Sequence, residues 1–257
     1  MYATKRLLAA AALLSFSLVP AFAADTLESI EKASTENWGK IKTFSATMDS
    51  VQSREQGGMS MTGSSKGTIE YSNSGKMFYR MEMTSSQAMK TPQGEQKMDG
   101  SSLMIFDGEF MWVQQDMMGQ KQAFKMKPPQ EDPLGMGGEP LWKSMKETFT
   151  LTLVGDEEVD GRATHVIEGA PIGDAALELG KAKFNFDKET GISIRQEMFD
   201  KAGKSVGVTK LTNMKTNSEI AADRFKYTAP EGVQVQDMSA AQPAAEPAPA
   251  PAPAPAK

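Results

Sequence analysis

Short apolar runs separated by turn-forming residues dominate the chain from residue 67 to residue 235. Strand-like runs lie at 67–83, 103–113, 122–127, 149–169, 182–199 and 204–215, and two more close the chain at 225–227 and 233–235. Turn signals such as Asn-Ser-Gly and Asp-Gly join consecutive runs at near-regular spacing, which is typical of an antiparallel meander and not of alternating βαβ units. The pattern therefore predicts a mainly β protein of the α+β class.

Residues 25–42 have the periodicity of a helix instead. Asp25 suits the N-cap, with Glu28 as its reciprocal partner three residues on. Apolar side chains fall on one stripe made of Leu27, Ile30, Ser34, Trp38 and Ile41. Because Ser34 interrupts this stripe, we expect the helix to lie against a sheet with moderate burial.

Two shorter helical segments are predicted within the meander. A Pro/Gly-rich loop at 128–140 leads into a helix at 141–147, with Pro140 at the first helical position. The apolar side chains of this helix are Leu141, Trp142 and Met145. A further helical turn is predicted within 171–181. We expect an internal helix of this kind to lie on the concave side of a curved sheet.

The run 103–113 carries a hairpin signal, Asp107-Gly108, because both central positions of a type I′ turn favour positive φ. A two-residue loop there predicts that Met104 lies opposite Met111. Side chains alternate along a strand, so one face would carry Met104, Phe106, Met111 and Val113, and the other Leu103, Ile105, Phe110 and Trp112. Both faces are apolar, so two different layers must cover this hairpin.

Methionine supplies much of the apolar surface, since 15 of the 19 methionines lie between Met48 and Met145. Residues that share a predicted strand face are Met77, Tyr79, Met81 and Met83 on one strand, and Phe124 and Met126 on another. Methionine side chains are flexible and polarisable, and suit surfaces that fit variable apolar partners. The pattern favours an adaptable apolar cavity over a methionine-rich core.

Copper is the rival interpretation of the methionines. Thioethers are soft ligands for Cu(I), and Met-x-Met occurs at Met59/Met61 and at Met81/Met83. The chain has one His and no Cys, which leaves few residues for a mixed site. His165 falls within a predicted strand, where we expect a structural role, and no metal or other cofactor is predicted.

The two ends of the chain differ from its middle. Basic residues at Lys5 and Arg6, an apolar run at 7–19 and the sequence Ala21-Phe22-Ala23 predict a secretory signal peptide over 1–23. With no Cys, the cleavage site is not a lipid-attachment site. We expect one domain over 24–238 and, over 239–257, an Ala/Pro-rich tail that favours polyproline II. These features predict a mature protein in a bacterial periplasm.

Charge and motifs exclude several classes of function. A net charge of −5 without basic clusters is typical of a protein that does not bind nucleic acid. No nucleophile elbow surrounds any Ser, and no cluster of His has the spacing of a metal site. The acidic residues between Asp156 and Asp160 suit a solvated turn better than a calcium site. We therefore predict that the chain is not an enzyme.

Four stretches resemble the LolA-type carriers, a family of periplasmic proteins that sort outer-membrane lipoproteins. They are "GTIEYSNSGKMFYRMEM", "LMIFDGEFMWVQQ", "FDKETGISIRQEMFDKAG" and "NSEIAADRFKYTAPEGVQV". Their order and spacing carry the resemblance, which covers most of residues 25–236. It implies an incomplete, strongly curved antiparallel barrel whose open, concave side is closed by helices, and an apolar cavity that receives acyl chains.

This resemblance assigns roles to the residues above. The cavity would be lined by Met77, Tyr79, Met81, Met83, Met104, Phe106, Met111, Val113, Phe124 and Met126, and the lid by Trp38, Leu141, Trp142 and Met145. Known carriers have Arg-Pro at the turn of the first hairpin; this chain has "YSNSGK", and Arg80 is the candidate gate.

The resemblance also implies a working cycle and partners. The chain would carry the acyl chains of lipoproteins or other lipids toward the outer membrane, as a monomer that does not span the membrane. Its partners would be an inner-membrane donor and an outer-membrane acceptor. The alternative is a sensor or structural module of the cell envelope on the same fold, and the less favoured one is a methionine-rich Cu(I)-binding protein.

Overall fold

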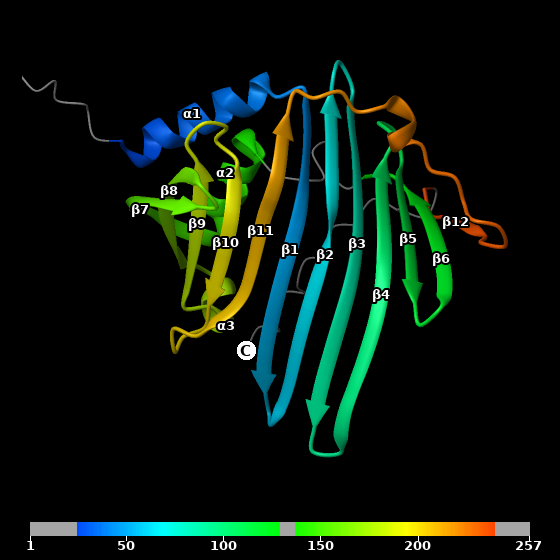
Figure 1. Cartoon of the computed structure of the whole chain (residues 1–257). Coiled ribbons are helices and arrows are strands. Elements are labelled where there is room, and N and C mark those ends of the chain that lie inside the picture. The colour runs from blue at the N-terminus through cyan, green and yellow to red at the C-terminus, as the bar shows by residue number, and fades with distance from the viewer. Residues whose placement is uncertain (1–24, 129–136, 240–257) are drawn as a thin grey trace, which may run out of the picture.

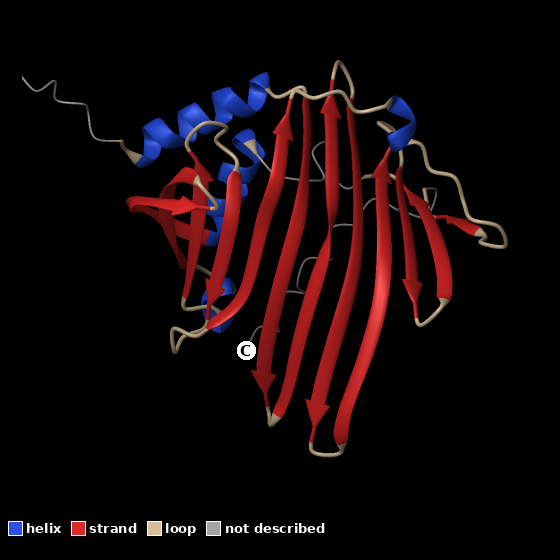
Figure 2. Ribbon diagram, viewed as in Figure 1, coloured by secondary structure: helices blue, strands red, loops and turns tan. Residues whose placement is uncertain are grey.

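The computed structural model describes residues 25–128 and 137–239. The predicted signal peptide at 1–23, most of the loop at 128–140 and nearly all of the predicted tail lie outside these residues. Within them, strands make up most of the structure, and a few helices lie around the sheet (Figure 2). The predicted mainly β architecture is confirmed.

Twelve strands in the described part of the chain form one curved, open sheet. They are β1 Thr43–Gln56, β2 Met59–Asn73, β3 Met77–Thr91, β4 Gly94–Phe106, β5 Met111–Met117, β6 Gln120–Met126, β7 Phe149–Val159, β8 Arg162–Pro171, β9 Lys181–Asp187, β10 Ser193–Phe199, β11 Ser205–Thr216 and β12 Val235–Asp237. Their order is β12-β6-β5-β4-β3-β2-β1-β11-β10-β9-β8-β7 (Figure 1).

Two meanders build this order. β1 to β6 pair consecutively, as do β7 to β11, and the pairing of β1 with β11 joins the two halves. All neighbours are antiparallel except β12, which pairs in parallel with β6. The predicted meander is therefore confirmed, but the predicted strands did not include β1. The prediction of a strand at 225–227 is wrong: a 3₁₀ helix, η1 (Ala222–Phe225), ends there.

The helices begin later or earlier than the sequence predicts. α1 spans Leu27–Lys40, and its N-cap is Thr26, which exchanges hydrogen bonds with Ser29; the predicted Asp25–Glu28 cap is wrong. α2 spans Gly138–Thr148 with Gly137 at its N-cap, so Pro140 is the third helical residue and not the first. α3 (Ala175–Glu178) occupies the predicted turn within 171–181.

We call the sheet face against which α1 and α2 pack the inner face. Ile30 of α1 and Trp142 of α2 form one core cluster with Ile167 and Phe184 of the sheet. In the sheet, one row of directly paired residues crosses from β8 to β3, namely Ile167, Phe184, Gln196, Thr209, Ser50, Ser65 and Ser85. Paired residues point to the same side of a sheet, so this row fixes the inner face from the helices to β3.

The C-terminal segment covers the opposite, outer face near β3 to β6. Tyr227 stacks on Trp112 of β5 with ring centroids 5.2 Å apart, and Phe225 packs on Phe78 at 5.7 Å. Arg224 forms an ion pair with Glu70 of β2 at 2.9 Å. Figure 1 shows this segment crossing the upper ends of the central strands before it reaches β12. The hairpin at 103–113 is thus covered on its outer face by the chain itself.

Candidate functional site

The ten residues predicted to line a cavity all lie on the inner face. Eight of them form two rows of directly paired residues across β3 to β6. The rows are Tyr79, Phe106, Met111 and Met126, and Met81, Met104, Val113 and Phe124. Met77 and Met83 lie two positions along β3 from these rows and therefore point to the same side.

The rows continue into β2 and β1, for which no cavity residue was predicted. Tyr79 is paired with Tyr71 and then Phe44, while Met81 is paired with Ile69 and then Ala46. All four added residues are buried. The alternation Ile69-x-Tyr71 was a usable signal on β2, and Phe44-x-Ala46-x-Met48 was an equivalent signal on β1, because single polar residues separate the apolar ones.

This surface contains both buried aromatic side chains and partly buried methionine side chains. Tyr79 is fully buried, with its ring 5.9 Å from that of Phe106. Met77, Met81 and Met104 are only partly buried and pack against the edge of the same core cluster. The surface therefore consists of an aromatic base with mobile thioether side chains around it, and such side chains can repack when an apolar ligand arrives.

The four predicted lid residues do not form one group. Trp38 contacts the paired rows, with its ring centroid 5.2 Å from Tyr71 and 6.3 Å from Phe44. Leu141, Trp142 and Met145 pack instead over β7 to β9, where Trp142 stacks on Phe186 at 4.7 Å. Trp38 is thus the described helix residue that links α1 to the methionine-rich surface.

Gly137 lets Trp38 hold this place. A Cβ atom at Gly137 would come within 2.4 Å of the Trp38 ring, far inside van der Waals contact. The start of α2 therefore lies directly on the ring, and residue 137 has to lack a side chain.

Arg80 lies on the outer face, opposite to the ten apolar residues. Its guanidinium donates to Glu82 at 2.8 Å and its Nε is 4.0 Å from Glu70, and its side chain is 15% exposed. Glu70 also holds Arg224 of the C-terminal segment. This position does not fit the predicted gate, because the sheet separates Arg80 from α1 and α2.

The hairpin register differs from the prediction by two residues. Met104 pairs with Val113 and not with Met111, because Gly108 and Glu109 are the central residues of the turn. The Asp107 carboxylate accepts hydrogen bonds from Glu109 N, Phe110 N and Trp112 Nε1 at 2.7–2.9 Å. Burial alone would raise the pKa of Asp107, but these hydrogen bonds hold it below its usual range. A shift of two keeps every side chain on its face, so the predicted faces are correct.

Two hollows in the described residues are lined by side chains other than these ten. A hollow of about 730 Å³ lies over β11, β1, β2 and β3, and its lining includes Val51, Val208, Ser64 and Ser86, which pair in one row on the outer face. A smaller hollow of about 220 Å³ includes Met98, Gln115 and Met117 on the inner face.

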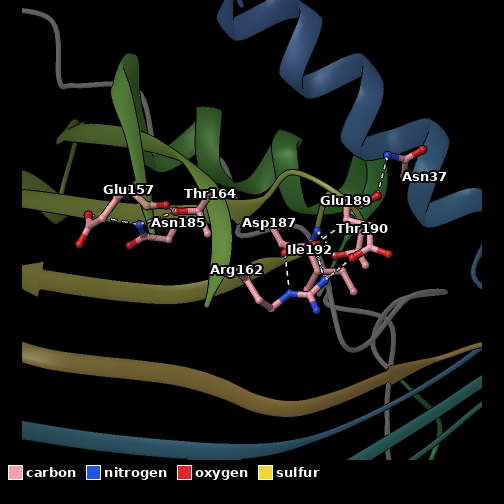
Figure 3. Close-up of polar contacts among 9 residues, drawn as sticks. All are labelled: Asn37, Glu157, Arg162, Thr164, Asn185, Asp187, Glu189, Thr190 and Ile192. Carbon is pink, nitrogen blue, oxygen red and sulfur yellow. Dashed lines mark hydrogen bonds and ion pairs between the residues drawn. The ribbon is translucent and has the colours of Figure 1, made fainter. Parts of the chain in front are cut away.

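A polar network ties the β8–β9 end of the sheet together (Figure 3). The Asp187 carboxylate accepts two hydrogen bonds from Arg162, at 2.6 and 2.9 Å, and two more from Thr190. Burial would raise the pKa of Asp187, but Arg162 and Thr190 together hold it below its usual range. Asn185, fully buried nearby, donates to Thr164 at 3.1 Å. Each of these side chains makes at least one hydrogen bond within the network, so the network supports the fold.

His165 and the acidic residues beside it also form structural contacts. His165 Nδ1 lies 3.1 Å from Asp156 Oδ1, and Lys188 donates to the same carboxylate. In the described residues, no three His, Cys, Asp or Glu side chains are arranged to hold a metal ion. No helix among them is long and apolar enough to cross a membrane.

Comparisons with known proteins place the fold. No protein-family model matches the chain, and no curated protein matches its sequence. An uncharacterized conserved protein from Thermus thermophilus superposes with a TM-score of 0.50 at 13% identity, over 82% of this chain and 98% of that one.

Two further structures match less well. A LolA superfamily protein from Nitrosomonas europaea gives a TM-score of 0.29 at 11% identity, over 79% of this chain and 99% of that one. The Mycobacterium tuberculosis lipoprotein LppX gives 0.38 at 10% identity, over 76% and 97%. At identities of 10–13%, these likenesses concern the fold alone.

Proposed function

We propose that this chain binds the acyl chains of lipoproteins or other lipids on the inner face of its sheet and carries them across the periplasm. The observation that supports this most directly is the pair of apolar rows from β3 to β6. They place eight aromatic, aliphatic and methionine side chains on the face that also holds α1 and α2.

The energetics of such a site need no reacting group. Each CH₂ group transferred from water to an apolar surface contributes about 0.8 kcal/mol. A long acyl chain can therefore be held by contact with apolar side chains alone. The partly buried Met77, Met81 and Met104 would move aside, while the buried Tyr79 and Phe106 keep the base of the site fixed.

The working cycle follows from the predicted signal peptide and the resemblance to LolA-type carriers. The mature chain would receive a lipid from an inner-membrane donor and deliver it to an outer-membrane acceptor. Trp38 is the residue we assign to the lid, since its ring lies against the apolar rows. Opening would require α1 to move Trp38 away from Tyr71 and Phe44.

Native mass spectrometry tests this function. The mature protein is isolated gently from the periplasm, and a delipidated sample is then incubated with a triacylated peptide or with phospholipid vesicles. We expect a bound mass that matches a lipid or an acylated peptide. A protein that stays free of ligand in both samples would contradict the proposal.

A matched pair of variants on β3 locates the site. Met81→Asp places a charge on the inner face and should abolish loading, whereas Met81→Leu should leave it almost unchanged. Thr84→Asp places the same charge on the outer face of the same strand, opposite Lys66, and should load normally. Equal loading of Met81→Asp and Thr84→Asp would exclude the inner face as the binding surface.

A further inference from the structure

Methionines gather a second time on the inner face, at the end far from α1 and α2. The members of this distal methionine group are Met59, Met61, Met89 and Met98, on β2, β3 and β4. Met59 is 48% exposed and Met61 46%. Figure 1 shows that the hairpin ends of these strands lie at the opposite end of the sheet from α1. The proposed lipid surface, which lies near the helices, does not include them.

Strand pairing brings the four side chains around Met89. Met61 is directly opposite Met89, which places two Cβ atoms about 4.5–5.5 Å apart. On the other side of β3, Met89 is opposite Gln96, so Met98 is its diagonal neighbour; Met59 is the diagonal neighbour on β2. Diagonal neighbours are about 7–8 Å apart and within reach of long side chains.

Open space borders the group on both sides. Met61 lines a hollow of about 510 Å³ together with Arg54 and Glu178. Met98 lines the hollow of about 220 Å³ described above. The thioether sulfurs can therefore turn toward one point without displacing a packed core.

The surroundings of the group favour a soft ion over a hard one. Its nearest inner-face neighbours on β3 and β4 are the neutral Gln87 and Gln96, and Arg54 is neutralised by Glu178 at 2.7 Å. Lys90 and Lys97 alternate with the methionines and point to the outer face. The four members of the group offer neither the carboxylate nor the imidazole ligands that suit Ca²⁺, Mg²⁺ and Zn²⁺, whereas their thioethers suit Cu(I).

We propose that Met61, Met89 and Met98, with Met59 beside them, form a binding site for Cu(I). The other Met-x-Met pair does not qualify, because Met83 is only 8% exposed and Met81 packs against the core. One chain would then hold two separate methionine surfaces, an apolar one near the helices and a metal-binding one at the distal strand ends.

Anaerobic titration of the mature protein with Cu(I), kept reduced by ascorbate, tests the site against the chromophoric chelator bicinchoninate. We expect one Cu(I) per chain. Loss of an outer-shell partner alone typically lowers metal affinity about 10- to 100-fold, so Met61→Leu/Met89→Leu, which removes two ligands, should weaken binding by at least about 100-fold. Leucine keeps the side-chain volume, and circular dichroism verifies that the variant folds.

The control variant is Met118→Leu/Met238→Leu, which removes two exposed methionines outside the group (80% and 47% exposed) and should bind as the unmodified chain does. As a second readout, the methyl NMR signals of Met61, Met89 and Met98 should shift on addition of Ag(I), which forms the same thioether bonds without redox chemistry. The proposal would be overturned if the chain bound no Cu(I) in competition with the chelator, or if both variants lost the same Cu(I) affinity. It would also be overturned if Ag(I) shifted only the methyl signals of other methionines.

Discussion

The Ser34 hydroxyl donates a 2.6 Å hydrogen bond to the backbone oxygen of Gly191, 157 positions further along the chain. The same hydroxyl accepts a hydrogen bond from Trp142 Nε1 at 3.1 Å. Ser34 is 2% exposed and Trp142 is fully buried. One buried hydroxyl therefore joins α1, α2 and the β9–β10 turn, and it fixes the two helices on the inner face.

Ser34→Ala should lower the stability of the protein. The variant leaves the Trp142 N–H and the Gly191 carbonyl without this partner in a buried place, which costs about 1–3 kcal/mol. Urea denaturation measures the loss. Lys32→Ala on the same helix is the control, because its ion pair with Glu36 is exposed and 4.0 Å long and such pairs contribute little. Equal midpoints for the two variants would contradict the role of Ser34.

Gly191→Ala should be more damaging than a substitution at another left-handed glycine. Gly191 has a φ of +72°, and an added Cβ would lie 2.5 Å from the Ser34 Cα. Gly203 has a φ of +80° with nothing within 4 Å, so Gly203→Ala carries only the conformational cost of about 1–2 kcal/mol. In urea denaturation, we expect Gly191→Ala to lower the free energy of unfolding by at least about 1 kcal/mol more than Gly203→Ala does. A reversed order would show that the turn does not press on α1.

The stabilising contribution of the Asp187 carboxylate should be lost in acid. Its pKa in the folded protein is below the usual range, so its contribution to stability is complete above the unfolded pKa of about 3.9 and is lost as the pH falls through the folded pKa. Asp187→Asn removes the carboxylate that Arg162 and Thr190 hold. The stability difference between the two proteins should therefore be constant near neutral pH and narrow below about pH 4. Urea midpoints across this range measure it, and a difference that stays constant to about pH 2 would refute the assignment.

Tyr227→Ala should loosen the C-terminal segment from the outer face. Its ring stacks on Trp112 and its hydroxyl donates to Gln114 at 3.1 Å. We expect a loss of about 1–3 kcal/mol, since the ring is partly buried and an aromatic pair contributes about 0.5–1.5 kcal/mol beyond its buried area. Tyr227→Phe loses only the hydrogen bond and should cost about 0.5–1.5 kcal/mol. Hydrogen exchange at β12 reports the loosening; unchanged exchange in Tyr227→Ala would mean that β12 docks independently of Tyr227.

The alternation of side chains along each strand was enough to predict which residues share a face of the sheet. Alternation along β3 placed Met77, Tyr79, Met81 and Met83 together before any fold was known, and the structure keeps them together because the side-chain period of a strand is fixed by its backbone. By the same rule, the predicted faces of the 103–113 hairpin were correct although its predicted register was wrong by two residues. The register prediction was wrong because Asp107 is not a central residue of the turn. Its side chain accepts backbone hydrogen bonds from the position before the turn, and Gly108 is the first central residue.

Details that depend on distant residues were not predictable. Arg80 looked like a gate residue because it lies beside the first hairpin turn. Its orientation is set by Glu70 and Glu82, which the sheet places on the outer face.

The sequence by itself determined the strand class and which residues share a face, because backbone geometry and side-chain alternation are local. The tertiary structure alone decided which face is inner, since that depends on where α1 and α2 pack. It decided also that Ser34 meets Gly191, and that the two Met-x-Met pairs have different surroundings. Met81 and Met83 lie at the core while Met59 and Met61 lie at an exposed strand end, and the sum of long-range pairings produces that difference.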